Sequence, residues 1–167
     1  MKGDDAASVD ASTSNADAST SRADASPRSP GSSGGVVSTP YPVQLRFSDT
    51  DRLGHVNNAV YATFAELGRL AFLRELGMTD KGLILAHLSI DFLRQVRLED
   101  ECAVVTRVVG VGNTSFELAQ TLDANGEPAA RFRAVIVCFD YATQRPIRVP
   151  DDFRRALLGG DGRSPSE

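Results

Sequence analysis

The sequence predicts a small α+β domain in which one long helix lies across an antiparallel sheet. Three observations predict this fold class. One helical pattern of apolar residues begins near residue 57, strand-like segments lie on both sides of it, and tight-turn sequences occur between the later segments. Because an amphipathic helix and a half-apolar sheet must bury those surfaces together, the helix is expected to cover one face of the sheet.

Residues 1–39 differ in composition from the rest of the 167-residue chain. They contain 10 Ser, 7 Ala and 5 Asp, and no Leu, Ile, Phe or Tyr. Such a segment buries too little apolar surface to offset the entropy cost of ordering, so a disordered tail is predicted. A seven-residue Asp-Ala-Ser repeat within it has Ala and Ser where a coiled coil needs Leu or Ile. The folded domain is expected over residues 40–158, followed by a flexible C-terminus over 159–167.

The first two predicted elements are a strand and the long helix. Apolar and polar residues alternate over residues 41–47, which favours a strand, and a polar loop follows it. From Asn57 onward apolar residues recur at offsets of three and four, which predicts a helix of about 19 residues. Asn57 is a suitable N-cap, and Gly77 stands where a C′ glycine belongs.

Four strand-like segments follow the helix, and we expect tight turns to join them into one antiparallel sheet. The segments are residues 83–96, 101–111, 114–122 and 129–141. Asn125-Gly126 is a strong hairpin signal because both residues tolerate positive φ, and Gly112-Asn113 marks a second hairpin. An amphipathic stretch over residues 151–158 predicts a short terminal helix.

Composition excludes several classes of protein. No run of 18 apolar residues exists, and the acidic N-terminus lacks the apolar core of a secretory signal. The net charge of −4 gives no general attraction to nucleic acid or to an anionic membrane, so neither is expected as a partner. Cys102 and Cys138 are too few for a disulfide framework or a zinc site. We expect buried free thiols in a cytoplasmic protein that binds no metal.

Polar residues crowd the loop that leads into the helix: Asp49, Asp51, His55, Asn57 and Asn58. A helix start presents unpaired N–H groups and a partial positive charge, so it can hold an anion or an oxyanion. An aspartate at such a place can attack a carbonyl or deprotonate water. The alternative is that Asp49, Asp51 and Asn57 only cap the helix and the turn. A histidine such as His55, taken alone, is more often an ordinary polar loop residue than a catalyst.

A longer pattern runs from this loop into the helix: Asp49-Thr50-Asp51-x-x-Gly54-His55-Val56-Asn57-Asn58-x-x-Tyr61, followed by Glu66 and Arg69. The pattern resembles the 4-hydroxybenzoyl-CoA thioesterase family of hotdog-fold acyl-CoA thioesterases, and the resemblance covers about residues 41–150. It implies a five-stranded antiparallel sheet wrapped around the helix. It also implies two subunits joined edge to edge, often paired again into a tetramer, with active sites at the subunit interface.

The resemblance also implies roles for individual residues. Asp51 corresponds to the catalytic carboxylate, and the backbone N–H of Asn58 to the group that points at the thioester carbonyl. Many family members have Tyr or His at the position of Asn58. The catalytic histidine of acyl-ACP thioesterases matches His55, a secondary candidate, but their catalytic asparagine falls on Leu53. The expected substrate-contacting residues are Gly54, Asn57, Tyr61 and Glu66.

The function implied by the resemblance is hydrolysis of an acyl-CoA thioester to a free carboxylic acid and CoA, with no cofactor. Asp51 would act as a nucleophile or as a general base, and the sequence does not choose between these. Two alternatives stay open: an acyl-ACP thioesterase, and a non-catalytic acyl-CoA-binding hotdog protein. A hydratase of the same fold would need an additional Asp-His signature, which we do not find. A homodimer or homotetramer is expected.

Overall fold

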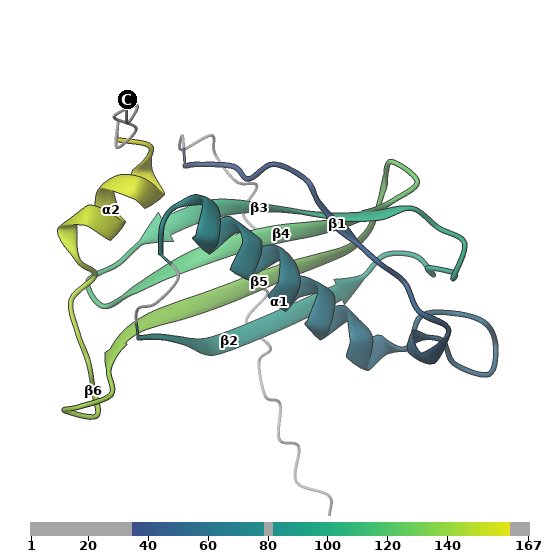
Figure 1. The fold of residues 1–167 in the computed structure, drawn as a ribbon, viewed down its shortest axis with the longest axis horizontal. Helices are drawn as coiled ribbons and strands as arrows, with labels where there is room; N and C mark the ends of the chain where they lie inside the picture. Colours follow the sequence, from purple (N-terminus) through teal and green to yellow (C-terminus); the bar gives the residue numbers. More distant parts are fainter. Residues whose placement is uncertain (1–34, 79–81, 161–167) are drawn as a thin grey trace, which may run out of the picture.

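The computed structural model describes residues 35–78 and 82–160, and its long helix lies along one face of an antiparallel sheet (Figure 1). The α+β class predicted from the sequence is confirmed. The elements in chain order are β1 (Tyr41–Val43), the 3-10 turn η1 (Phe47–Asp49), α1 (Asn58–Glu75), β2 (Leu83–Phe92), β3 (Cys102–Val111), β4 (Ser115–Ala124), β5 (Glu127–Asp140), β6 (Arg145–Pro146) and α2 (Asp151–Leu158).

The sheet has the strand order β1-β3-β4-β5-β2, and the two-residue β6 adds to the end of β5. Strands β3, β4 and β5 form consecutive hairpins, and Asn125 and Gly126 take the predicted positive φ values of 54° and 81°. The prediction of a tight turn between β2 and β3 is wrong, because β2 pairs with β5 at the opposite side of the sheet. The connecting residues 93–101 contain no glycine, asparagine or proline to form a hairpin turn.

The segment before α1 departs from the predicted boundaries at both of its ends. The strand expected over residues 41–47 ends at Val43; residues 44–46 have no regular structure, and the 3-10 turn begins at Phe47. Residues 35–39, which we assigned to the tail, lie beside β3, where Val36 O accepts from Val108 N (3.0 Å) and Ser38 N donates to Thr106 O (2.8 Å). The expectations for residues 1–34 and 161–167 lie outside the described residues.

Helix α1 begins and ends where the sequence predicted. Asn57 is its N-cap, with Oδ1 accepting from Ala59 N at 3.0 Å, and Gly77 follows the helix with φ 69°. The helix packs tightly on the sheet at Gly68, where an added Cβ would lie 2.7 Å from Val104 Cβ. Beneath it, Gln120 Nε2 donates to Ala65 O at 2.9 Å, which ties the middle of the helix to β4.

Two apolar clusters fill the space between the sheet and the helices. One surrounds Tyr61 and Phe64 near the start of α1, and the other surrounds Phe72 and reaches α2 at the far end of the molecule (Figure 1). Cys102 and Cys138 are free and buried, as predicted. Within the described part of the chain, neither helix has the length and apolar content needed to cross a membrane. The polar loop packs against the first cluster.

Candidate active site

The three Asx side chains of the loop have different structural roles. Asp49 Oδ2 accepts from Arg46 N at 2.8 Å and closes the 3-10 turn. Asn57 Oδ1 caps α1 at Ala59 N. The capping interpretation therefore describes these two side chains well. It accounts for only part of Asp51.

Asp51 uses one carboxylate oxygen to shape the loop and leaves the other open. Its Oδ1 accepts from Leu53 N (2.8 Å) and from His55 N (3.1 Å). Between these, Gly54 takes φ 78°, a value that side-chain-bearing residues rarely adopt. No hydrogen bond from a described residue ends on Oδ2. The N–H groups of His55 and Leu53 lower the pKa of the Asp51 carboxyl, so the group is charged at neutral pH.

The first turn of α1 has an amide N–H available beside this carboxylate. Ala59 N donates to the capping side chain of Asn57, and Val60 N donates to Asn57 O at 2.9 Å. The N–H of Asn58 has no acceptor among the described residues. It stands at the first position of an 18-residue helix, where the helix dipole favours negative charge. Such an N–H can stabilise an oxyanion.

Asp51 and Asn58 line the same hollow, which has a volume of about 380 Å³. The hollow is open to solvent on one side and is lined by the polar loop, the first turn of α1, and the end of β2 with the residues that follow it. Its lining residues are Asp51, Leu53, His55, Val56, Asn58, Tyr61, Phe92, Leu93, Arg94 and Gln95.

Four of the predicted site residues therefore meet, and three do not line the hollow. Asp51, His55, Asn58 and Tyr61 line it. Gly54 shapes the loop from an exposed position, Asn57 is engaged as the cap, and Glu66 is exposed farther along α1. The carboxylate, the imidazole and the open amide are thus brought together by a segment of only eight residues.

The wall formed by residues 92–95 was not predicted from the sequence. The pairing of β2 with β5 determines where these residues lie, and no local sequence pattern predicts a contact between segments so far apart in the chain. The ring of Phe92 meets the ring of Tyr61 edge to face, with centroids 5.1 Å apart. Tyr61 itself is buried, at 3% exposure, and joins the hollow to the first apolar cluster.

Two further buried ionisable groups do not line the hollow. Burial raises the pKa of the Cys102 thiol to about 11, so this group is protonated at neutral pH and is a poor nucleophile. Arg69 of α1 is 5% exposed, and its Nη1 has no partner among the described residues. Burial lowers the pKa of Arg69, and the carboxylate of Glu66 opposes that shift.

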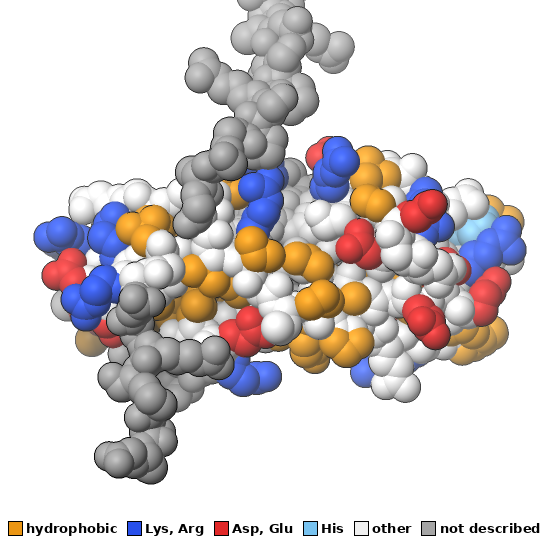
Figure 2. Space-filling view, turned by 90° about the horizontal axis from the view of Figure 1, so that it is seen from above, with side chains coloured by type: hydrophobic (Ala, Val, Ile, Leu, Met, Phe, Trp, Pro, Cys, Tyr) orange, Lys and Arg blue, Asp and Glu red, His pale blue; other side chains and the backbone are white. Residues whose placement is uncertain are grey.

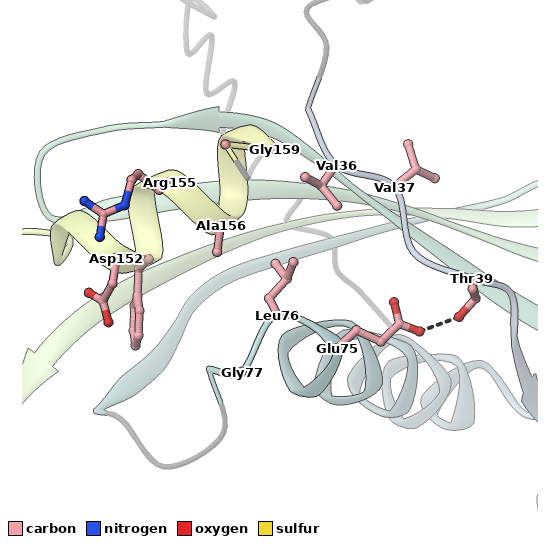
Figure 3. Close-up of a pocket in the computed structure, with 12 residues that line it drawn as sticks. Val36, Val37, Thr39, Glu75, Leu76, Gly77, Asp152, Arg155, Ala156 and Gly159 are labelled. Carbon is pink, nitrogen blue, oxygen red and sulfur yellow. Dashed lines mark hydrogen bonds between the residues drawn. The ribbon is translucent and has the colours of Figure 1, made fainter. Parts of the chain in front are cut away.

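A larger cavity, of about 750 Å³, lies at the opposite end of α1 (Figure 3). Segment 36–39, the end of α1 and helix α2 enclose it, and Figure 3 shows Leu76 and Ala156 facing each other across it. The Thr39 hydroxyl donates to Glu75 at its rim. None of the predicted site residues lines this cavity. The smaller hollow therefore is the candidate active site, because it contains the carboxylate and the open amide.

Comparison with known proteins identifies similar sequences. The family model of the thioesterase-like superfamily matches residues 45–157. The acyl-CoA thioesterase YbgC of Haemophilus influenzae is 27% identical over 125 residues, which cover 70% of this chain and 92% of that protein. The chloroplastic acyl-acyl carrier protein thioesterase ATL3 of Arabidopsis thaliana is 29% identical, over 70% of this chain and 65% of its own length.

Solved structures agree with the sequence comparison. A thioesterase from Thermus thermophilus, crystallised with coenzyme A and Zn, superposes with a TM-score of 0.65 at 33% identity and covers 75% of this chain and 95% of its own. A predicted thioesterase from Bacillus stearothermophilus superposes with a TM-score of 0.67 at 26% identity, over 75% of this chain and 96% of its own. The hotdog fold expected from the resemblance is thereby confirmed.

Proposed function

This chain belongs to the thioesterase-like superfamily, and we propose that it hydrolyses acyl-CoA thioesters with the carboxylate of Asp51 and the backbone N–H of Asn58. One observation carries the assignment of the site. A charged carboxylate with one open oxygen and an open amide at the positive end of a helix line the same hollow. Attack on a thioester carbonyl needs these two groups, one to generate the nucleophile and one to hold the developing negative charge.

In the proposed mechanism the thioester carbonyl oxygen accepts a hydrogen bond from Asn58 N–H. One such donor typically lowers the barrier by about 3 kcal/mol. The carboxylate of Asp51 either attacks the carbonyl carbon, which gives a mixed anhydride and expels the CoA thiolate, or takes a proton from the attacking water. In the anhydride route, water then hydrolyses the anhydride to free acid and the Asp51 carboxylate. In ¹⁸O-labelled water, label recovered on Asp51 identifies this route with attack at the Asp51 carbonyl, whereas attack at the acyl carbon leaves Asp51 unlabelled, as the general-base route does. Trapping the mixed anhydride with hydroxylamine during turnover distinguishes these last two cases.

The other predicted residues have supporting roles in this proposal. The imidazole of His55 lines the hollow and stays the second candidate for proton transfer. Gly54 gives the loop its turn, and Asn57 fixes the start of the helix. Tyr61 forms the apolar floor of the hollow, and Glu66 stands outside it.

The direct test is thiol release from a panel of acyl-CoA thioesters by Asp51→Asn. The Asn Oδ1 can accept the same two backbone bonds, so we expect an intact loop and a loss of at least about 100-fold in kcat. Asp49→Asn is the matched control, since Asp49 lies in the same loop and does not line the hollow. Full turnover by Asp51→Asn would remove Asp51 from the mechanism.

We also propose that two chains join through the outer edge of β2. Strand β1, at the other edge of the sheet, has only three residues and contains Pro42, which offers no N–H. Strand β2 has ten residues and no strand on its outer side among the described residues. Leu85 is exposed near its start, Phe92 at its last residue and Leu93 just after it. Since Phe92 and Leu93 also line the hollow, a partner at this edge would help to enclose the substrate.

A further association into a tetramer is compatible with the surface of the molecule. Leu67 and Leu70 are exposed on α1. Figure 2 shows apolar side chains in several groups across the face seen from above, with charged side chains among them and at both ends. Exposed apolar side chains grouped on a surface can mark a protein contact. The buried free thiols Cys102 and Cys138 support our placing the protein in a reducing compartment.

An acyl-ACP thioesterase is the second candidate function, because the similarity to ATL3 of Arabidopsis thaliana spans the same domain. Matched acyl-CoA and acyl-ACP substrates with one acyl group distinguish the two activities. We expect the higher kcat/KM with acyl-CoA.

A further inference from the structure

The wall of the hollow at the end of β2 has a fixed backbone. Leu93 N and Arg94 N both donate to Ala129 O, at 2.9 and 3.2 Å. The Arg94 guanidinium donates to the carbonyl oxygen of Ala124, at the base of the β4–β5 hairpin. These bonds tie the backbone of the wall to the β4–β5 hairpin, so the side chains of the wall set the width of the hollow in this structure.

The floor of the hollow is equally fixed. Tyr61 is buried in the first apolar cluster, and its ring contacts Phe64 with centroids 6.3 Å apart. A deeper pocket beneath Tyr61 would require displacing closely packed core residues, which is energetically costly.

Phe92 is the one aromatic wall residue free to set the size of the hollow. Its side chain is 49% exposed, in contrast to Tyr61, and its ring stands edge to face on Tyr61 at an interplanar angle of 84°. A hollow of about 380 Å³ lies at the lower end of the range for ligand pockets and must also admit the thioester end of the CoA arm.

We propose that Phe92 is a specificity-determining residue whose ring closes the acyl end of the hollow against Tyr61 and limits the enzyme to compact acyl groups. This inference rests on the proposed function. Acyl groups that fit between the catalytic loop and the Phe92 ring are accepted. Longer chains meet the ring and cannot bring their carbonyl to Asn58.

The test measures kcat/KM for acyl-CoA thioesters from two to twelve carbons, and for benzoyl-CoA, with Phe92→Ala, Phe92→Leu and Phe92→Trp. Each methylene that the enlarged hollow newly admits should raise kcat/KM about fourfold, the value of burying one CH₂. We therefore expect Phe92→Ala to prefer longer chains than the wild type, Phe92→Leu to shift less, and Phe92→Trp to shift toward shorter chains. Benzoyl-CoA shows whether a compact ring fits the wild-type hollow as well as a short chain.

Leu98→Ala is the matched control, because Leu98 lies in the connection that follows Phe92, is exposed, and does not line the hollow. It should keep the wild-type profile. Because Phe92 also lies at the proposed dimer edge, the mass of each variant is measured by light scattering. If Phe92→Ala is monomeric or unfolded, Phe92→Leu and Phe92→Trp test the proposal instead, because their preferred chain lengths should shift in opposite directions.

A change by the same factor at every chain length, or an unchanged profile in all three variants, would overturn the role of Phe92. Failure of the proposed function is a separate result, namely no thiol release from any acyl-CoA by the wild type. Binding of non-hydrolysable S-alkyl-CoA thioethers then tests the inference, since Phe92→Ala should still shift the dissociation constants toward longer chains.

Discussion

The two oxygens of Asp51 have separate functions. Oδ1 accepts from two backbone N–H groups and sets the course of the loop, whereas Oδ2 makes no bond to a described residue. The same hydrogen bonds that order the loop also keep the carboxylate charged. A substitution of Asp51 that removes the whole carboxyl group would therefore disturb the loop as well as the charge. Asp51→Asn removes only the charge and keeps the Oδ1 acceptor, so it is the informative substitution.

The pH profile of kcat/KM tests the charge state of Asp51. Donation from His55 N and Leu53 N lowers the pKa of its carboxyl below the ordinary value of 3.8. Because the pKa is lowered, the charged form prevails at every pH above 3.8 and is lost only below it. We expect kcat/KM to stay level from about pH 8 to about pH 5, with the midpoint of the acid limb below 3.8.

An essential histidine base would give a different profile, with the acid limb between about pH 5 and 8. A limb in that range that disappears in His55→Ala would transfer the role of base from Asp51 to His55. Circular dichroism at each pH is the control, because loss of fold at low pH would imitate loss of the carboxylate.

At the scale of residues, the sequence pointed to those lining residues of the hollow that lie close together in the chain. Asp51, His55, Asn58 and Tyr61 lie within eleven residues, so one turn and one helix start bring them together. Asn57 is harder to assign from sequence, since an Asx residue at a helix start suits a cap and a ligand equally. Phe92 could not be predicted, because its place depends on which strand β2 pairs with.

At the scale of elements, the position of α1 depends on how closely it approaches the sheet. At Gly68 an added Cβ would lie 2.7 Å from Val104 Cβ, and Gln120 bonds the helix carbonyl of Ala65 close by. The helix carries both Asn58 and Tyr61. A displacement of α1 from the sheet would therefore alter the hollow as well as the core.

Gly68→Ala should lower the free energy of unfolding by about 1–3 kcal/mol, the usual cost of overpacking a core. An added methyl group in an exposed helix would be stabilising instead, so the sign of the change is informative. Denaturant unfolding measures it, and the double substitution Gly68→Ala with Val104→Ala should recover part of the loss. A Gly68→Ala protein as stable as the wild type would show that the helix can shift freely on the sheet.

The elements themselves were predicted with uneven success. Both ends of α1 and the hairpin at Asn125-Gly126 were correct, because each depends on local cap or turn chemistry. The strand over residues 41–47 was extended too far, since alternation continues into a turn that Asp49 closes. The contact of residues 35–39 with β3 is made partly by backbone hydrogen bonds, which composition does not reveal.

At the scale of the whole molecule, the two edges of the sheet differ. Segment 35–39 and β1 follow the outer side of β3 and close that edge with a short strand that contains Pro42. The ten residues of β2 have no neighbour on their outer side among the described residues. A long open edge strand pairs readily with another strand, and here the hollow lies at its end.

Leu85→Lys should therefore convert the proposed dimer into a monomer. Leu85 is 41% exposed on β2, and a lysine at a sheet edge opposes pairing with a second strand. Light scattering should give twice the 17.8 kDa chain mass for the wild type and the single mass for the variant. Val37→Lys is the matched control. Val37 is 58% exposed beside β3 at the opposite edge, so this substitution should leave the dimer intact.

If contact with the partner completes the hollow, thioesterase activity should be lost together with the dimer. A Leu85→Lys protein that stays dimeric would show that the chains do not join through β2. A monomer that keeps full kcat/KM would show that the active site does not need a partner at this edge.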